Sequence, residues 1–387
     1  MITARPTGVR MPLVRLVPPL IVGLVAIAVG LNTDPVRTWS SLLVAGFYVL
    51  SVALGGMLFI AVQQLSGAAW SVGMRRVAEA MTCALPVAAL MMALLFFGRG
   101  DLFAWAAVAP VGERAAGLGT RYFAVLFVGV RTVLFLGLWM VFAWLMRRTS
   151  ERQDTSDDPI HHRRMLRYSA VFIVLFALSF SLATVDWLLA LDPRWMSTIY
   201  AVYAFAGLLV QGVAAVTLVV VLLHEHGHLV DTVNANHLHD LGKLLLALTT
   251  FWAYIWLCQY LLIWYGNLPD EVTYYVVRTG PRWVALFFAN LVINWLIPFG
   301  VLLPRAAKRS PTVLKWIAVL ILIGRWLDVY LLVMPQTMKA PAFGLLELSI
   351  AAAYGSVLWF VVSAALARQP LIVLHDPLLF ECLRHEQ

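Results

Sequence analysis

Residues 200–223 read YAVYAFAGLLVQGVAAVTLVVVLL, an apolar run that contains no Asp, Glu, Lys or Arg. A helix that crosses the hydrocarbon core of a bilayer needs about 20 mostly apolar residues, so this run predicts a transmembrane helix. The rest of the chain has the same character: 62% of its 387 residues are hydrophobic and 12% are charged. A soluble domain carries about twice that charged fraction. We therefore expect an all-α polytopic membrane protein with a single integral membrane domain over residues 1–387.

Other runs along the chain have the same length and apolarity, and they bring the expected number of spans to ten. The first run could instead be a cleaved signal peptide, because arginines precede it and Ala26-Ile27-Ala28 resembles a small-residue cleavage site. We expect it to be retained as a helix. The predicted spans are 13–31, 42–65, 78–97, 122–146, 168–191, 200–223, 244–265, 284–303, 313–333 and 345–367.

The basic residues are unevenly shared between the two sides of the predicted bundle. The side of the N-terminus holds the longest basic loop, RRTSERQDTSDDPIHHRRMLR (147–167), together with Arg75, Arg76 and the turn PRAAKR (304–309). Loops rich in Lys and Arg lie in the cytoplasm of membrane proteins. We therefore expect both termini of this multi-pass chain to be cytoplasmic.

Two short segments indicate an internal duplication. VDWLLALDP (185–193) and LDVYLLVMP (327–335) each place an Asp seven residues before a Pro, near the end of the fifth and the ninth predicted helix. Four helices with their loops separate the two segments. This weak repeat fits two four-helix bundles related by duplication, with two flanking helices.

Charged residues inside the predicted spans are the candidate functional groups. A charge at the centre of a bilayer costs roughly 2.5–3.5 kcal/mol on insertion scales. Arg325 and Asp328 lie one turn apart, so they could pair and hold helices together, or the carboxylate could exchange protons. Asp186 has no cation within one turn of its own helix, so its partner must come from another helix. Arg131 and Arg325 are the two candidates.

Further polar groups accompany these charges, most of them toward the outer half of the membrane. Gln259 and Tyr260 are candidate hydrogen-bond donors to a quinone oxygen, and Trp187 is a candidate aromatic wall beside Asp186. Glu347 begins the tenth span on the outer side and is a candidate for a proton path.

The stretch HEHGHLVDTVNANHLHDLGK (224–243) joins the sixth and seventh spans on the cytoplasmic side. It could hold a metal, cap the two helices, or take up and release protons through His237, His239 and Asp240, because histidine titrates near neutral pH. Asp240 is most simply the N-cap of the seventh helix. His224 and His226 would complement the negative end of the sixth helix.

Several classes of site are absent from the sequence. Cys83, Cys258 and Cys382 form no CxxC pair and are too few for the usual four-thiolate iron–sulfur cluster. A transmembrane haem needs facing histidines inside the spans, and all nine histidines lie outside the predicted ones. We expect no metal, no haem and no iron–sulfur cluster in this chain. The net charge of +8 reflects cytoplasmic loops and does not indicate a nucleic-acid partner.

Several long segments together resemble one known family. They look like the ten-helix membrane subunits of alternative complex III, which are relatives of the polysulfide reductase membrane subunit in the NrfD-like superfamily. The resemblance covers about 147–383, whereas the first four helices match mainly in pattern. The segments are TVDWLLALDPRWMSTIYAVYAFAG (184–207), HLHDLGKLLLALTTFWAYIWLCQYLLIWYGNLPDE (237–271), NLVINWLIPFGVLLPRAAKR (290–309), GRWLDVYLLVMP (324–335) and HDPLLFECL (375–383).

The resemblance implies a membrane subunit of a quinol:electron-acceptor oxidoreductase in a bacterial inner membrane. It implies membrane lipids, a homologous ten-helix subunit, and periplasmic iron–sulfur and multihaem cytochrome c subunits as partners. It also implies menaquinone or ubiquinone as substrate, although the chain looks like the shorter ten-helix subunit, which is less clearly catalytic. Asp186, Asp328 and Arg325 would be the catalytic residues. Arg131 would tune them and, with Trp187, Gln259 and Tyr260, would be a candidate quinone-binding residue. The alternatives are a non-catalytic anchor of the same complex and a secondary transporter.

Overall fold

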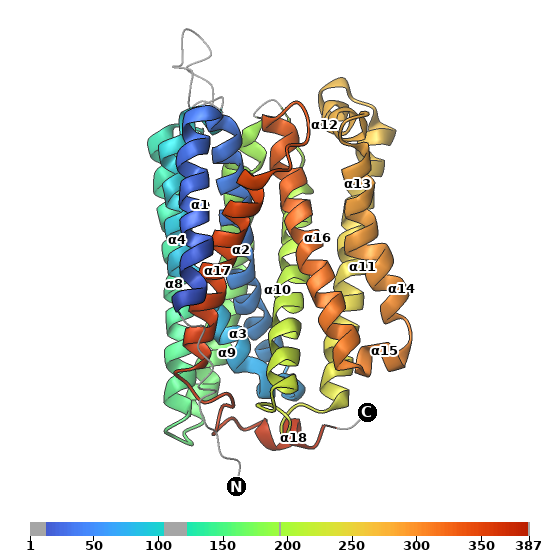
Figure 1. Cartoon of the computed structure of the whole chain (residues 1–387). Coiled ribbons are helices and arrows are strands. Elements are labelled where there is room, and N and C mark those ends of the chain that lie inside the picture. Colours follow the sequence, from blue (N-terminus) through green and yellow to red (C-terminus); the bar gives the residue numbers. More distant parts are fainter. Residues whose placement is uncertain (1–12, 104–121, 193–194, 386–387) are drawn as a thin grey trace.

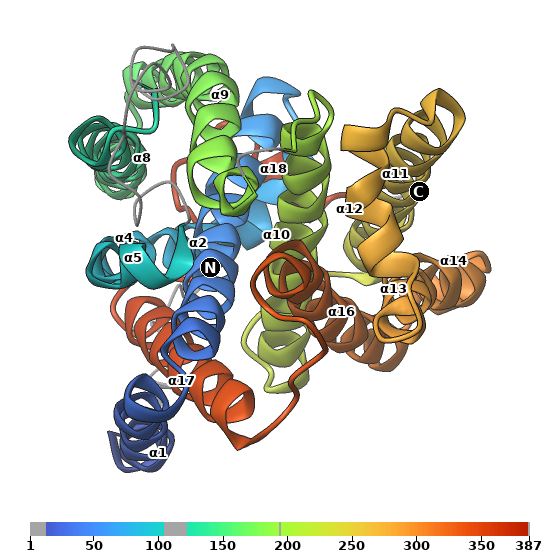
Figure 2. The ribbon, with the colours of Figure 1, turned by 90° about the horizontal axis from the view of Figure 1, so that it is seen from above.

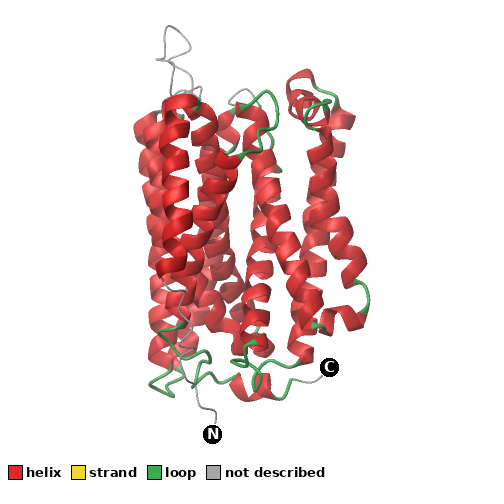
Figure 3. Cartoon of the chain, viewed as in Figure 1, coloured by secondary structure: helices red, strands yellow, loops and turns green. Residues whose placement is uncertain are grey.

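The computed structural model describes residues 13–103, 122–192 and 195–385 and contains no strand in these ranges (Figure 3). Ten helices in the described ranges are long and apolar enough to cross a membrane, so all ten predicted spans are confirmed. Eight of the ten are continuous helices: α1 (Leu13–Thr33), α2 (Pro35–Leu65), α8 (Val125–Gln153), α9 (Ile160–Trp187), α10 (Tyr200–Glu225), α11 (Ala235–Gly266), α16 (Pro311–Thr337) and α17 (Leu345–Leu366).

The third and eighth spans are interrupted, and a proline explains each interruption. Proline lacks the N–H that would bond the carbonyl four residues earlier, and its ring clashes with that carbonyl. Pro86 follows the break between α3, which ends at Thr82, and α4. Pro298 follows a π-helical turn, Val292–Leu296, that separates α13 from α14. The pieces are η1 (Ala69–Met74), α3 (Arg75–Thr82), α4 (Leu85–Leu94), η2 (Leu95–Gly98) and α5 (Arg99–Leu102), and then α13 (Val284–Leu291), the π-turn and α14 (Ile297–Leu302).

The spans run alternately up and down, and two ends of the molecule result (Figure 1). We name one end the tail face: it is formed by the loops 154–159, 226–234 and 303–310, with α15 (Arg305–Arg309), and by the segment 367–385, with α18 (Leu379–Leu383). The opposite end is the α12 face, which carries the short helix α12 (Pro269–Thr279) and the loop 338–344.

The spans form two four-helix bundles, as the repeat predicts. The first bundle comprises α2, the third span, α8 and α9, and the second comprises α10, α11, the eighth span and α16 (Figure 2). The bundles meet where α2 packs on α10 and α16, and the paired helices α1 and α17 flank α2. Asp186 and Asp328 therefore lie on the last helix of their respective bundles.

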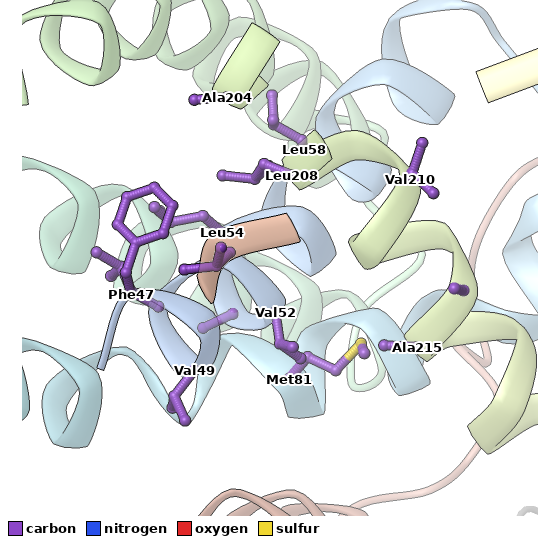
Figure 4. Packing of buried hydrophobic residues seen from close by; sticks show 14 of the residues in the cluster. Phe47, Val49, Val52, Leu54, Leu58, Met81, Ala204, Leu208, Val210 and Ala215 are labelled. Carbon is purple, nitrogen blue, oxygen red and sulfur yellow. The ribbon is translucent and has the colours of Figure 1, made fainter. Parts of the chain in front are cut away.

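The contact between α2 and α10 is the apolar centre of the molecule. Leu54 and Leu58 of α2 face Leu208 of α10, and Met81 of α3 lies further along, beside Val52 and Ala215 (Figure 4). The backbones approach closely at Gly55 and Gly212: a Cβ atom added to either would lie 2.5 Å from the other's Cα. Small residues allow such approach between membrane helices, where there is no hydrophobic drive to bring helices together.

Two arginines that the sequence placed in a cytoplasmic loop are buried instead. Arg75 and Arg76 begin α3 and are 5% and 2% exposed. Both pair with Glu79 of the same helix, Arg75 also pairs with Asp376, and Arg76 pairs with Asp154. These ion pairs tie the C-terminal segment and the α8–α9 loop to the third span.

The close contact between the bundles gives a stability prediction. We expect Gly212→Ala to destabilise the protein by about 1–3 kcal/mol, because the new methyl group overpacks the α2–α10 contact. Gly355→Ala on α17 is the matched control, since nothing lies within 4 Å of its added Cβ; it should be neutral or slightly stabilising. Thermal unfolding in detergent measures both, and equal effects would contradict the close contact.

Candidate functional site

The first buried charge centre joins α9 to α8 in the first bundle. Asp186 is 0% exposed, and Arg131 donates to both of its carboxylate oxygens, from Nε to Oδ2 at 2.8 Å and from Nη2 to Oδ1 at 2.7 Å. The guanidinium lies over the rings of Tyr122 and Phe127, at 3.8 and 4.4 Å from their centroids. Of the two candidate partners for Asp186, the structure confirms Arg131.

Trp187 lies beside this centre but is held by its own partner. Its Nε1 donates to Thr132 Oγ1 at 3.0 Å, and its ring meets Trp139 edge-on at 6.0 Å. Asp186 and Trp187 border a cavity of ≈ 20 Å³ whose other walls are mostly apolar, such as Met92. Such a volume is room for about one water molecule.

The second centre is built around Asp328, which is 1% exposed in the second bundle. Its carboxylate has partners on three helices. Arg325, one turn earlier on α16, lies 2.7 Å from Oδ2. Tyr203 of α10 donates its hydroxyl to Oδ1, and Asn290 of α13 donates to the same oxygen at 2.7 Å.

The Arg325 side chain is only 2% exposed and needs a glycine opposite it. A Cβ atom at Gly207 of α10 would overlap the guanidinium, so this position must lack a side chain for the arginine to fit. The ring of Trp252 on α11 lies 5.5 Å from Arg325 Cζ. Arg325 therefore contacts the carboxylate on its own helix and an aromatic ring across the bundle.

Several buried polar atoms around Asp328 have no hydrogen-bond partner within the protein. They are Arg325 Nε and Nη1, Trp252 Nε1, Gln259 Nε2 and Asn294 Oδ1. Buried polar groups are nearly always satisfied by protein or ordered water. Gln259, Asn290 and Asp328 share a cavity of ≈ 20 Å³, again room for about one water. Asn294 lies in the π-helical turn, a feature that is frequent at functional sites.

A residue that the sequence did not single out stands between this cavity and the surface. Arg278 of α12 is 3% exposed and donates to the carbonyls of Leu331 and Tyr274. Its guanidinium lies 3.3 Å from the centroid of Tyr274, whose ring stacks on Trp195 at 4.1 Å. Arg278 and Tyr274 line both the small cavity and a surface cleft of ≈ 400 Å³ that Asp192 and Asp270 also border.

Helix α12 was missing from the sequence prediction, although its ends carry ordinary helix signals. Pro269 occupies the first turn together with Asp270 and Glu271, and Arg278 lies in the last turn, just before Gly280. Proline and acids at the start, and a cation and glycine at the end, are typical of a helix. A search for membrane-length runs overlooks a helix this short.

The four residues predicted to bind quinone do not come together. Arg131 and Trp187 belong to the first bundle, whereas Gln259 and Tyr260 belong to the second. Tyr260 packs against Trp256, Tyr275 and Phe287 and does not line the Gln259 cavity. Ligand sites usually measure about 300–1,000 Å³, so neither of the two cavities of ≈ 20 Å³ accepts a quinone ring as it stands.

The histidine stretch forms caps and tail contacts on the tail face. The prediction that Asp240 caps α11 is wrong: α11 begins at Ala235, and Asn234 caps it together with His237 in a capping box. The sequence misses this because Asn234 lies one turn and a half earlier, in a region too polar for a span. As expected, His226 lies at the end of α10, with Nδ1 2.7 Å from the Leu222 carbonyl.

The C-terminal segment 367–385 supplies two of the partners of this stretch, His385 and Cys382. Asp240 pairs with Lys243 at 2.5 Å and with His385 at 2.6 Å, and His237 Nε2 lies 3.4 Å from Cys382 Sγ. Burial raises the pKa of the Cys382 thiol, so this group is protonated at neutral pH. His239 is half-buried on the same turn. Within the described ranges, no three His, Cys, Asp or Glu side chains are grouped to hold a metal ion.

Glu347 lies on the α12 face, where its hydrogen bonds hold the start of α17. It is the third residue of α17, where it accepts from the Gly344 N–H at 2.9 Å. Arg37 of α2 donates to both of its oxygens, at 2.7 and 2.8 Å. Its recorded contacts thus join α17 to α2 and do not include Asp186 or Asp328.

No family model and no curated protein matches this chain. The resemblance to the alternative complex III subunits therefore stays a prediction, and the chemistry must be argued from the two buried centres.

The Asp186–Arg131 pair predicts a difference in stability between a single and a double variant. Arg131→Met should destabilise the protein by about 3–5 kcal/mol, because it leaves a buried carboxylate without its partner. The double change Arg131→Met/Asp186→Leu should recover most of that loss, since it removes both charges. The thermal midpoint in detergent is measured, with Arg282→Met at an exposed arginine as control. Additive losses in the double variant would contradict a direct pair.

Proposed function

We propose that this chain is the proton-transferring membrane subunit of a quinol:electron-acceptor oxidoreductase whose redox metals lie on partner subunits. The observation that carries the proposal is the Asp328 centre. A carboxylate in the membrane interior has an arginine, a tyrosine and an asparagine as partners and unsatisfied polar atoms around it. Ionisable groups placed this deep in membrane proteins commonly belong to proton relays.

Asp328 has the surroundings that a reversible proton carrier needs. While it is ionised, Arg325 neutralises its charge and two neutral donors satisfy Oδ1. When it takes up a proton, the arginine loses its counter-charge, and the ring of Trp252 is the group that can stabilise the guanidinium instead. In the protonated state the guanidinium thus has an aromatic ring, and no counter-charge, as its partner.

The surroundings of Asp328 favour proton exchange with the α12 face. On that side, the Gln259 cavity and the surface cleft share Tyr274 and Arg278 as lining residues. Toward the tail face, α16 buries Leu314, Ile317 and Ile321, which offer a proton no polar group. Arg278 and Tyr274 lie between the cavity and the cleft.

Quinol oxidation fits this chain less well than proton transfer does. Neither cavity that borders Asp186 or Asp328 has room for a quinone ring, and the predicted quinone ligands divide between the bundles. We therefore assign the oxidation of menaquinol or ubiquinol to the homologous ten-helix subunit. The basic residues of the tail face support a cytoplasmic orientation in a bacterial inner membrane. The iron–sulfur and multihaem cytochrome c subunits would then contact the α12 face.

The second candidate is a non-catalytic anchor, and one observation favours it. The Asp186–Arg131 and Glu347–Arg37 pairs each connect two spans with two hydrogen bonds, as purely structural pairs would. In an anchor, charge-neutral changes at Asp328 would affect assembly alone. In a proton-transferring subunit, they would affect turnover of an assembled complex.

The proposal is tested with Asp328→Asn in the assembled complex. The amide keeps the shape and its oxygen can still accept from Tyr203 and Asn290, but its NH2 group cannot replace the oxygen that faces Arg325, and it cannot exchange a proton at neutral pH. We expect quinol-driven proton transfer to fall by roughly 100-fold, a magnitude typical of lost acid–base catalysis. Proton release by reconstituted vesicles measures it, with Asp101→Asn at an exposed acid as control. Full proton transfer by an assembled Asp328→Asn complex would contradict the proposal.

A further inference from the structure

The lipid-facing side of α8 changes from apolar to basic as it reaches the tail face. Val141 and Trp144 are 52% and 49% exposed, and the exposed Arg148 and Arg152 follow at intervals of four residues. These four positions lie on one stripe of a helix. The Arg148 guanidinium lies over the Trp144 ring, 5.0 Å from its centroid. The stripe thus ends in two cations, the first of which rests on an interfacial tryptophan.

The neighbouring helix α9 shows the same change in the opposite chain direction. Arg163 and Arg167 are exposed at its beginning, and Val171 and Val174 follow with 50% and 62% exposure. The two helices pack against each other along the edge of the first bundle, joined by the loop 154–159 (Figure 2). Both stripes therefore present two arginines at the same end of the same pair of helices.

The four arginines lie just beyond the predicted spans 122–146 and 168–191, where lipid headgroups are expected. From the rise of a helix, their Cα atoms are roughly 2 to 9 Å from the nearer ends of these spans. The polar layer on each side of a bilayer is about 5–7 Å thick, and long arginine side chains extend toward it from slightly greater depth. The apolar members of both stripes then cover the upper acyl chains.

The acids of this region are engaged with other groups. Each of the four has a recorded partner that is not one of these arginines: Glu151 accepts from Gln369, Asp154 pairs with Arg76, Asp157 lies 3.5 Å from His375, and Asp158 accepts from the Ile160 N–H. For Arg148, Arg152, Arg163 and Arg167 themselves, the structure records no ion pair. Their positive charge is therefore left for a ligand from outside the chain.

We propose that the ends of α8 and α9 on the tail face form a binding site for an anionic phospholipid. The phosphodiester is bound by Arg148 and Arg163, with Arg152 and Arg167 on either side, and the acyl chains lie along the stripes of Val141 and Val171. A lipid is favoured over a soluble anion because apolar exposed residues continue directly from the cations on both helices. This site is independent of any role in proton transfer.

The test measures lipid binding to the full chain in mild detergent by native mass spectrometry. Dioleoyl phosphatidylglycerol should bind the native chain more tightly than dioleoyl phosphatidylcholine. Each arginine near an anionic headgroup contributes about fivefold to affinity, so Arg148→Gln/Arg163→Gln should weaken phosphatidylglycerol binding about 25-fold. Binding of phosphatidylcholine should not change.

Matched variants separate this site from general charge effects. Arg99→Gln/Arg282→Gln removes two exposed arginines near the α12 face and should leave phosphatidylglycerol binding unchanged. Arg148→Lys/Arg163→Lys keeps the charges and should retain most of the affinity, which also shows that these positions tolerate substitution. Equal loss in the control, equal binding of the two lipids, or displacement of the lipid by inorganic phosphate would each overturn the proposal.

Discussion

The ion pair between Asp328 and Arg325 is the interaction around which the second bundle is arranged. Placing a carboxylate in the membrane interior requires a counter-charge, and placing the arginine there requires space. The helices around α16 meet these needs: α10 supplies the Tyr203 hydroxyl and the side-chain-free position Gly207, and α13 supplies Asn290. The residues of α10 and α13 that contact this pair thus either donate a hydrogen bond to it or lack a side chain.

The two bundles use similar charges in different ways. In the first, Arg131 donates to both oxygens of Asp186 and lies against two aromatic rings, which is the geometry of a fixed pair. In the second, Arg325 reaches one oxygen of Asp328 and leaves two nitrogens unsatisfied, against one in Arg131, while each carboxylate borders a cavity with room for about one water. A fixed pair stabilises helix packing, whereas a partly satisfied one leaves room for a change of protonation. The second bundle is therefore the more suitable place for proton exchange.

Hydropathy predicts the spans because a helix that crosses the hydrocarbon core must be apolar along most of its length. The Asp–Pro repeat predicts the division into bundles. The side-chain partners that one helix finds on another are harder to predict from the sequence. The weak repeat aligns Asp186 with Asp328, but it does not indicate that one pairs with α8 and the other within α16. Arg75 and Arg76 resemble loop cations because their partners, Asp376 and Asp154, come from distant segments. Arg278 escapes notice because α12 is too short for a span.

The most direct test of the Asp328 account is infrared difference spectroscopy of the assembled complex during quinol turnover. If Asp328 exchanges protons, the spectrum contains a band in the protonated-carboxyl region that shifts in D₂O. This band should disappear in Asp328→Asn and persist in Asp186→Asn, since the latter carboxylate is fixed by Arg131. A spectrum that Asp328→Asn leaves unchanged would contradict the claim that this carboxylate carries a proton.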